Sequence, residues 1–145
     1  MFKLAVKDTS ELLEELKSFK NFSRFWDENE KEILPRKPLS LYLSEIVEEK
    51  GIKKADAIRR SELSEVYAYQ IFSGLRLPER KKLLPLLIGM GLSFDEIQDI
   101  LKFTGYARLY AKDPFDCAVI FGICKGLSVA DINCLLFDYG LDTLG

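Results

Sequence analysis

The sequence predicts an all-α fold. Apolar residues recur at the three- and four-residue spacing of amphipathic helices along almost the whole chain, and no segment alternates convincingly as a strand does. A length of 145 residues, with 48% hydrophobic and 30% charged residues and only five prolines, is typical of one compact domain with a small appendage. A helical unit also repeats in the C-terminal half with a period of 35 residues.

The composition excludes several classes of function. The chain has no histidine, which removes catalytic triads, histidine-ligated zinc and the commonest general base near neutral pH. The three cysteines, Cys117, Cys124 and Cys134, form no CxxC pair, so we expect buried structural thiols, with a redox or metal role as the alternative. We therefore expect a protein that is not an enzyme, without catalytic residues, metal site or cofactor.

The N-terminal sequence favours a cytoplasmic protein that does not contact a membrane. No stretch approaches the roughly 20 apolar residues of a membrane span. The first residues turn acidic before the core of a signal peptide could form.

Residues 1–34 are expected to form an N-terminal helical arm. A helix is predicted over about 10–20, with Asp8, Thr9 or Ser10 available as its cap. An aromatic cluster follows, consisting of Phe19, Phe22, Phe25 and Trp26. Two prolines, at positions 35 and 38, then break the chain. We expect the aromatic cluster to pack on the body of the protein, with a dimer or partner contact as the alternative.

Three helices are predicted next, over 39–50, about 53–61 and about 64–73. The first ends at Gly51, where a glycine suits the left-handed exit from a helix. Only Glu62 and Leu63 separate the other two, and Ser64 is placed to cap the last. On that last helix, one set of side chains is expected to face inward, namely Ala68, Ile71 and Phe72. Another set is expected to face outward, namely Val66, Tyr69, Gln70 and Ser73.

Beyond Pro78 the chain repeats itself, and each repeat predicts a helical hairpin. Residues 91–109 and 126–144 match at these pairs: Gly91/Gly126, Leu92/Leu127, Ser93/Ser128, Ile97/Ile132, Leu101/Leu136, Gly105/Gly140 and Leu109/Leu144. The serines stand three residues before an acidic residue, which is the spacing of a capping box, and the later glycines can end each helix. We expect one hairpin to pair about 79–90 with 93–104, and the other about 113–125 with 128–139. Two copies are too few for a solenoid.

The charge is uneven along the chain. Residues 35–82 contain eleven lysines and arginines against seven acidic residues, a net charge of +4, whereas the whole chain carries −2 and the remainder therefore −6. A positive segment within an acidic protein points modestly to an anionic partner.

The segment KKADAIRRSELSEVYAYQIFSG, from Lys53 to Gly74, has the features of a helix-turn-helix, in which one of two short helices enters the major groove. From about Leu39 to Gly105 the chain resembles the phage-repressor (Cro/CI, xenobiotic-response-element-like) family. The resemblance rests on Ile58, Leu63, Ala68 and Ile71 at inward positions, and on the stretch FSGLRLPERKKLLPLLIGMGLS. The family usually has glycine where this turn has Glu62, which predicts a strained backbone there.

The resemblance implies a sequence-specific transcriptional regulator with a five-helix DNA-binding domain over residues 35–109 and its recognition helix over 64–73 in the major groove of double-stranded DNA. Family members touch base edges at the positions of Ser64, Glu65, Val66, Tyr69 and Gln70. They touch phosphates at the positions of Lys54, Arg76, Arg80 and Lys81. A regulator needs these cations on the same side as Gln70.

Residues 110–145, the second hairpin, are expected to pack on the domain or to mediate self-association. A homodimer would place two recognition helices roughly 34 Å apart, as two half-sites require. Candidate dimer surfaces are the aromatic arm and the second hairpin, whose apolar residues are Phe115, Val119, Ile120, Phe121, Ile123, Leu135, Leu136 and Phe137. Core packing is the main use expected for most of these. The alternative function is a protein-interaction adaptor that has the fold but does not bind DNA and docks a partner through the arm or the C-terminal half.

Overall fold

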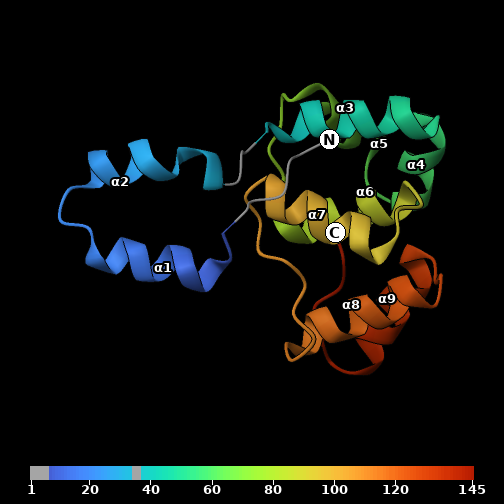
Figure 1. The fold of residues 1–145 in the computed structure, drawn as a ribbon. Coiled ribbons are helices and arrows are strands. Elements are labelled where there is room, and N and C mark those ends of the chain that lie inside the picture. Colours follow the sequence, from blue (N-terminus) through green and yellow to red (C-terminus); the bar gives the residue numbers. More distant parts are fainter. Residues whose placement is uncertain (1–6, 34–36) are drawn as a thin grey trace. The chain divides into compact units, whose positions relative to one another are not determined.

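The computed structural model describes residues 7–33 and 37–145 (Figure 1). Within these ranges the chain forms nine α-helices and one 3-10 turn and no strand, which confirms the all-α prediction. The chain divides into two compact units at residues 36 and 37, and each has its own internal packing. None of the described helices has the length and apolar character needed to cross a membrane.

The first unit is a short helical hairpin. Its elements are α1 (Thr9–Ser18), α2 (Phe22–Asn29) and the 3-10 turn η1 (Glu30–Glu32). Asp8 caps α1, as expected, by accepting a hydrogen bond from the Glu11 N–H. The sequence did not predict α2, because eight residues supply only about two turns of periodicity. The aromatic residues pack within the unit itself: the buried Phe25 ring lies 5.5 Å from Phe19.

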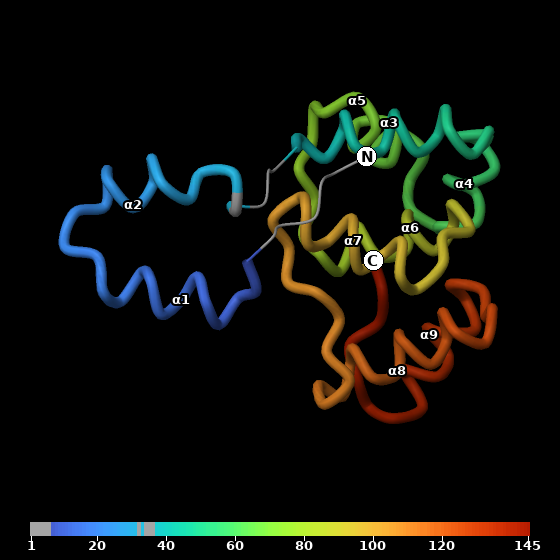
Figure 2. The backbone as a smooth tube through the Cα atoms, viewed as in Figure 1, coloured from blue at the N-terminus to red at the C-terminus, as the bar shows by residue number. Residues whose placement is uncertain are grey.

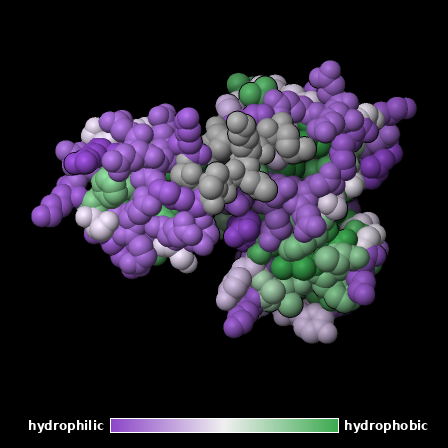
Figure 3. Space-filling model, viewed as in Figure 1, coloured by the Kyte–Doolittle hydropathy of each residue, from purple (hydrophilic) through white to green (hydrophobic). Residues whose placement is uncertain are grey.

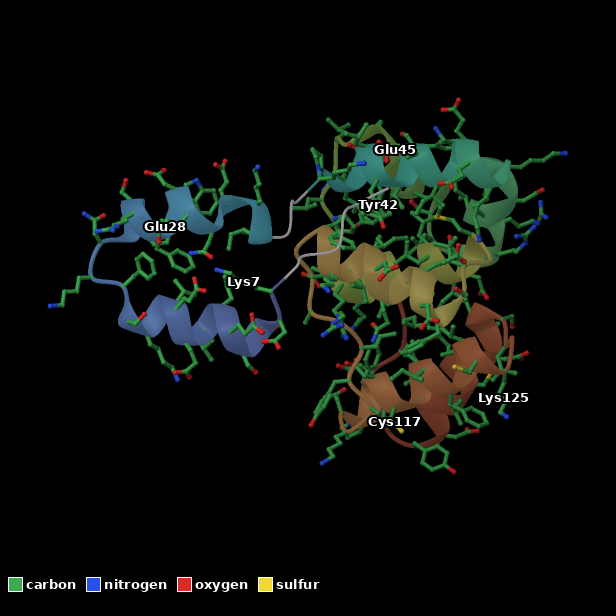
Figure 4. All side chains as sticks on the ribbon, viewed as in Figure 1. Lys7, Glu28, Tyr42, Glu45, Cys117 and Lys125 are labelled. Atoms are coloured by element: carbon green, nitrogen blue, oxygen red, sulfur yellow. The ribbon has the colours of Figure 1, made fainter. Side chains whose placement is uncertain are left out.

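A polar contact joins the start of this unit to its end. The Lys7 ammonium donates hydrogen bonds of 2.6 Å to Glu15 on α1 and to the buried Asn29 on α2. The hydrogen bond from Lys7 holds the pKa of Glu15 below its ordinary value. Figure 4 labels Lys7 between the two helices.

The second unit contains the remaining helices. They are α3 (Leu39–Lys50), α4 (Lys54–Ser61), α5 (Glu65–Ser73), α6 (Arg80–Gly89), α7 (Phe94–Phe103), α8 (Pro114–Cys124) and α9 (Val129–Asp138). Their bounds agree with the predicted ones to within one or two residues. Gly51 ends α3 with a φ of 64°, in the left-handed region as predicted. A salt bridge between Lys50 and Glu96 ties the end of α3 to the first turn of α7.

Helix α6 is the centre of the second unit. It packs against α4, α7 and α9, and four of its leucines, Leu83, Leu84, Leu86 and Leu87, are fully buried. Near its end, Gly89 lies so close to α4 that a Cβ atom there would come within 2.4 Å of the Ala57 carbonyl oxygen. The backbones of α4 and α6 can therefore approach at this point only because residue 89 has no side chain.

The two hairpins of the repeat pack face to face (Figure 2). Helix α6 packs on α7 and α9, and α8 packs on the same two helices. Each hairpin therefore contacts the other through both of its helices.

Both hairpins use the same polar contact to fix the chain that follows them. The Gln98 side-chain amide accepts a hydrogen bond from the Leu109 N–H and donates one to the Leu109 carbonyl. Asn133 makes the same two bonds to Leu144, eleven residues further on. The predicted serine caps are also present: Ser93 forms a full capping box with Glu96, and Ser128 accepts a hydrogen bond from the Asp131 N–H.

A bidentate ion pair links the two hairpins. The Arg80 guanidinium, at the start of α6, donates to both oxygens of Asp116 on α8, at 2.9 and 2.7 Å. It also donates to the carbonyls of Ala107 and Arg108. Asp116 is buried and its second oxygen also accepts from the Tyr110 N–H. The carboxylate is thus fully paired, as a buried charge requires.

The second hairpin is less buried than the sequence predicts. All three cysteines are exposed, so the expectation of buried thiols is wrong. Cys117 and Cys124 are exposed on α8, which packs through Val119 and Gly122, and Cys134 is exposed on α9, which packs through Ile132 and Leu136. Of the apolar residues expected in the core, Val119 and Leu136 are buried, whereas Phe121 and Phe137 are exposed. The others, Phe115, Ile120, Ile123 and Leu135, are half-buried.

The ion pair predicts a specific cost of mutation. Arg80→Ala leaves the buried Asp116 carboxylate without its counter-ion and should lower the free energy of unfolding by about 3 kcal/mol in urea denaturation. Arg76→Ala removes the same side chain from an exposed loop and should cost less than about 0.5 kcal/mol. Equal effects of the two variants would contradict a structural role for Arg80.

Candidate nucleic-acid interface

The turn between α4 and α5 has a left-handed residue at its first position. Glu62 has φ 61° and ψ 13°, and among the described residues no other non-glycine residue has positive φ. The Ser61 hydroxyl stabilises the turn by donating to the Ile58 carbonyl and accepting from the Leu63 N–H. Ser64 then begins α5 as its N-cap, accepting from the Tyr67 N–H at 3.1 Å, as predicted. Glu62 thus has the left-handed backbone conformation that glycine adopts most readily.

The inner face of α5 fixes the helix on the body. Ala68 and Ile71 have no exposed surface, and Phe72 is 3% exposed. The small Ala68 side chain allows a close approach where the helices meet. The prediction of these three inward residues is confirmed, so the opposite face of α5 is held in a defined direction.

The outer face of α5 is exposed and of mixed character. Val66 is 69% and Tyr69 40% exposed, and Ser64 and Glu65 are exposed as well. Gln70 is half-buried rather than fully exposed. A shallow hollow runs along this face and is lined by Lys54, Glu65, Val66, Tyr69, Gln70, Phe72 and Ser73.

Two of the expected phosphate-binding cations lie beside this face. The Arg76 backbone N–H donates to the Gln70 carbonyl, and its side-chain Nε donates to Gln70 Oε1, both at 3.1 Å. The Lys54 ammonium lies 5.3 Å from the centre of the Phe72 ring and lines the same hollow as Gln70. A positive charge thus stands at each of two positions along the outer face of α5.

The other two cations lie elsewhere. Arg80 is engaged by Asp116 and by two backbone carbonyls, which occupy four of its five N–H groups. Lys81 lines a hollow at the junction of the hairpins with Asp113, Pro114 and Phe115. Arg80 is thus engaged within the protein, and Lys81 lines a different hollow from Gln70, so the proposed interface includes neither of them.

Sequence reasoning missed the two leucines that flank Arg76. Leu75 is 74% and Leu77 79% exposed in the loop after α5. The signal was present, because the stretch Leu75-Arg76-Leu77 places apolar residues in a loop that precedes a proline. Their exposure adds an apolar border to the interface.

Within the described parts of the chain, no group of three or more histidine, cysteine, aspartate or glutamate residues could hold a metal ion. Comparison of the chain with known protein families, curated proteins and solved structures finds no match. The case for function therefore rests on the geometry of α4, α5 and their surroundings.

The left-handed turn residue provides a test of the local geometry. Glu62→Gly should raise the free energy of unfolding by about 0.5–1 kcal/mol, because glycine adopts positive φ without a steric penalty. Glu62→Gln removes the charge but keeps the Cβ atom, and should change stability by less than about 0.5 kcal/mol. Urea denaturation measures both. If Glu62→Gln stabilises the protein as much as Glu62→Gly does, the gain in stability comes from removing the charge and not from the backbone conformation.

Proposed function

We propose that this chain is a sequence-specific DNA-binding transcriptional regulator that places α5 in the major groove. The observation that carries the proposal is the pair of cations, Lys54 and Arg76, beside the exposed face of α5. A helix presented in this way, with phosphate-binding groups at its sides, has the geometry that major-groove recognition requires.

The arrangement of the central helices supports this reading. Helices α4 and α5 are joined by a three-residue turn, and the proposal takes α3, α6 and α7 as the other three helices of a five-helix repressor-type domain. Helix α4 would cross the DNA backbone, with Lys54 at its first residue directed at a phosphate. The outer face of α5 would then meet the base edges.

The side chains on α5 suggest how bases would be read. Gln70 can donate to a base-edge acceptor through its free Nε2 while Arg76 holds its Oε1. Val66 and Tyr69 offer apolar contact to thymine methyl groups, and Glu65 can accept from cytosine. Ser64 is at the N-terminal end of α5. The positive end of the helix dipole and the serine hydroxyl can both bind an oxygen of a base or a phosphate there. Arginine, the commonest reader of guanine, is absent from α5.

The small number of cations limits the affinity of one module. Two phosphate contacts, from Lys54 and Arg76, imply a slope of about −1.8 for the logarithm of the binding constant against the logarithm of salt concentration. A dimer on two half-sites doubles this to about −3.6. We therefore propose that the regulator acts as a homodimer.

A second candidate is a protein-interaction adaptor that does not bind DNA. The exposed Val66, Leu75 and Leu77 favour it, because apolar side chains at the centre and edge of a surface are typical of protein interfaces. Such a protein would use the same face of α5 for a partner protein, and its binding would depend weakly on salt.

DNA binding separates the two candidates. In fluorescence anisotropy with DNA fragments from around its own gene, we expect binding that weakens with salt and prefers some fragments. The variant Gln70→Ala/Arg76→Ala should lose at least tenfold in affinity, because it removes one base contact and one phosphate contact. Measuring the binding constant at two salt concentrations gives the slope of its logarithm against the logarithm of salt concentration.

Lys102→Ala is the matched control, since it removes an exposed cation from α7, outside the proposed interface. It should bind as the unmodified chain does. Equal losses in the control and in the double variant would indicate nonspecific attraction. An absence of binding at low salt would contradict the regulator and favour the adaptor.

A further inference from the structure

Helix α8 has an exposed apolar stripe on the side opposite its packed face. The stripe is formed by Cys117, Ile120, Phe121 and Cys124, at the i, i+3, i+4 and i+7 positions of one helix side. Phe121 is 51% exposed, both cysteines are exposed and Ile120 is half-buried. In the space-filling view hydrophobic residues gather over α8 and its neighbour α9 (Figure 3). A helix that is apolar on both sides is normally covered on both.

The stripe is complementary to itself. Its midpoint lies between Ile120 and Phe121, so a twofold rotation there sets Ile120 of one copy against Phe121 of the other. The same rotation sets Cys117 against Cys124 at each end. Read from either end of the helix, the stripe therefore has a small cysteine, two bulky residues and a second cysteine. An interface between two identical surfaces requires such a match.

Charge decides the direction of the pairing. Lys125 follows the C-terminal end of α8, and Asp113 caps its N-terminal end. Figure 4 shows Cys117 and Lys125 toward opposite ends of the helix. In an antiparallel pair with Ile120 opposite Phe121, each Lys125 lies opposite position 116 of the other copy, within one helical turn of its Asp113, and the two helix dipoles are favourably opposed. A parallel pair would instead bring the two Lys125 ammonium groups together.

We propose that the chain forms an antiparallel homodimer through α8, with Cys117 of each copy opposite Cys124 of the other. A single pair of helices buries less surface than a standard interface of roughly 1,600 Å², so we expect a weak dimer. The dimer does not depend on DNA binding, although it would supply the two half-site readers of the proposed function.

Sedimentation without DNA tests the interface on its own. The full chain should reach about twice its mass of 16.6 kDa at tens of micromolar. Phe121→Lys, which changes an exposed side chain and should leave the fold intact, should sediment as a monomer. Phe137→Lys, a matched change on α9 outside the stripe, should remain dimeric. A monomeric full chain, or equal effects of both variants, would overturn the proposal.

Thiol cross-linking tests the direction. Two variants are compared, and both carry Cys134→Ser. The first also carries Cys124→Ser and keeps only Cys117. The second also carries Cys117→Ser and keeps only Cys124. With the short dithiol reagent dibromobimane, the mixture should cross-link several-fold more than either chain alone. In the antiparallel dimer, like cysteines lie about 10 Å apart along the axis at a rise of about 1.5 Å per residue. Preferential cross-linking within either single-cysteine chain would overturn the antiparallel arrangement.

Discussion

The close approach of α6 to α4 at Gly89 is the contact on which the rest of the second unit depends. Helix α6 supplies the largest continuous run of buried leucines, and it can reach α4 only where residue 89 lacks a side chain. This approach holds α4 in place, and the turn at Glu62 then sets the direction of α5. The outer face of α5 is exposed because its inner face is fixed through Ala68 and Ile71. The packing of Gly89 against α4 and of the inner face of α5 thus determines where the proposed interface lies.

The other end of α6 connects this surface to the second hairpin. Arg80 pairs with the buried Asp116 on the proposed dimer helix α8, while α6 packs on α4, which in turn packs on the proposed DNA-reading helix α5. Helices α8 and α9 pack on α6 and α7, and the outer stripe of α8 is left uncovered. A rigid link between a reading helix and a dimerisation helix is what fixes the spacing of two half-sites.

Local signals in the sequence predicted most of the secondary structure. The serine caps, Gly51 and the periodicity of the repeat placed the helices of the second unit closely, and the repeat even carries the Gln98 and Asn133 amides at matching positions. Long-range pairing could not be predicted in this way. In the sequence, Arg80 is one of several cations at the start of a predicted helix. Nothing near it indicates that its guanidinium pairs with Asp116, 36 residues later. The cysteines were misplaced for a similar reason, since a uniformly apolar α8 does not show which side is buried.

The central claim is that the outer face of α5 binds DNA, and an NMR titration tests it most directly. Amide resonances of the labelled chain would be followed while a mixed-sequence DNA duplex is added at low salt. The account predicts that the largest shifts fall on residues 64–73, on Lys54 and on Arg76, and that the amides of α9 stay unchanged. Shifts confined to other surfaces, or none at saturating duplex, would contradict it.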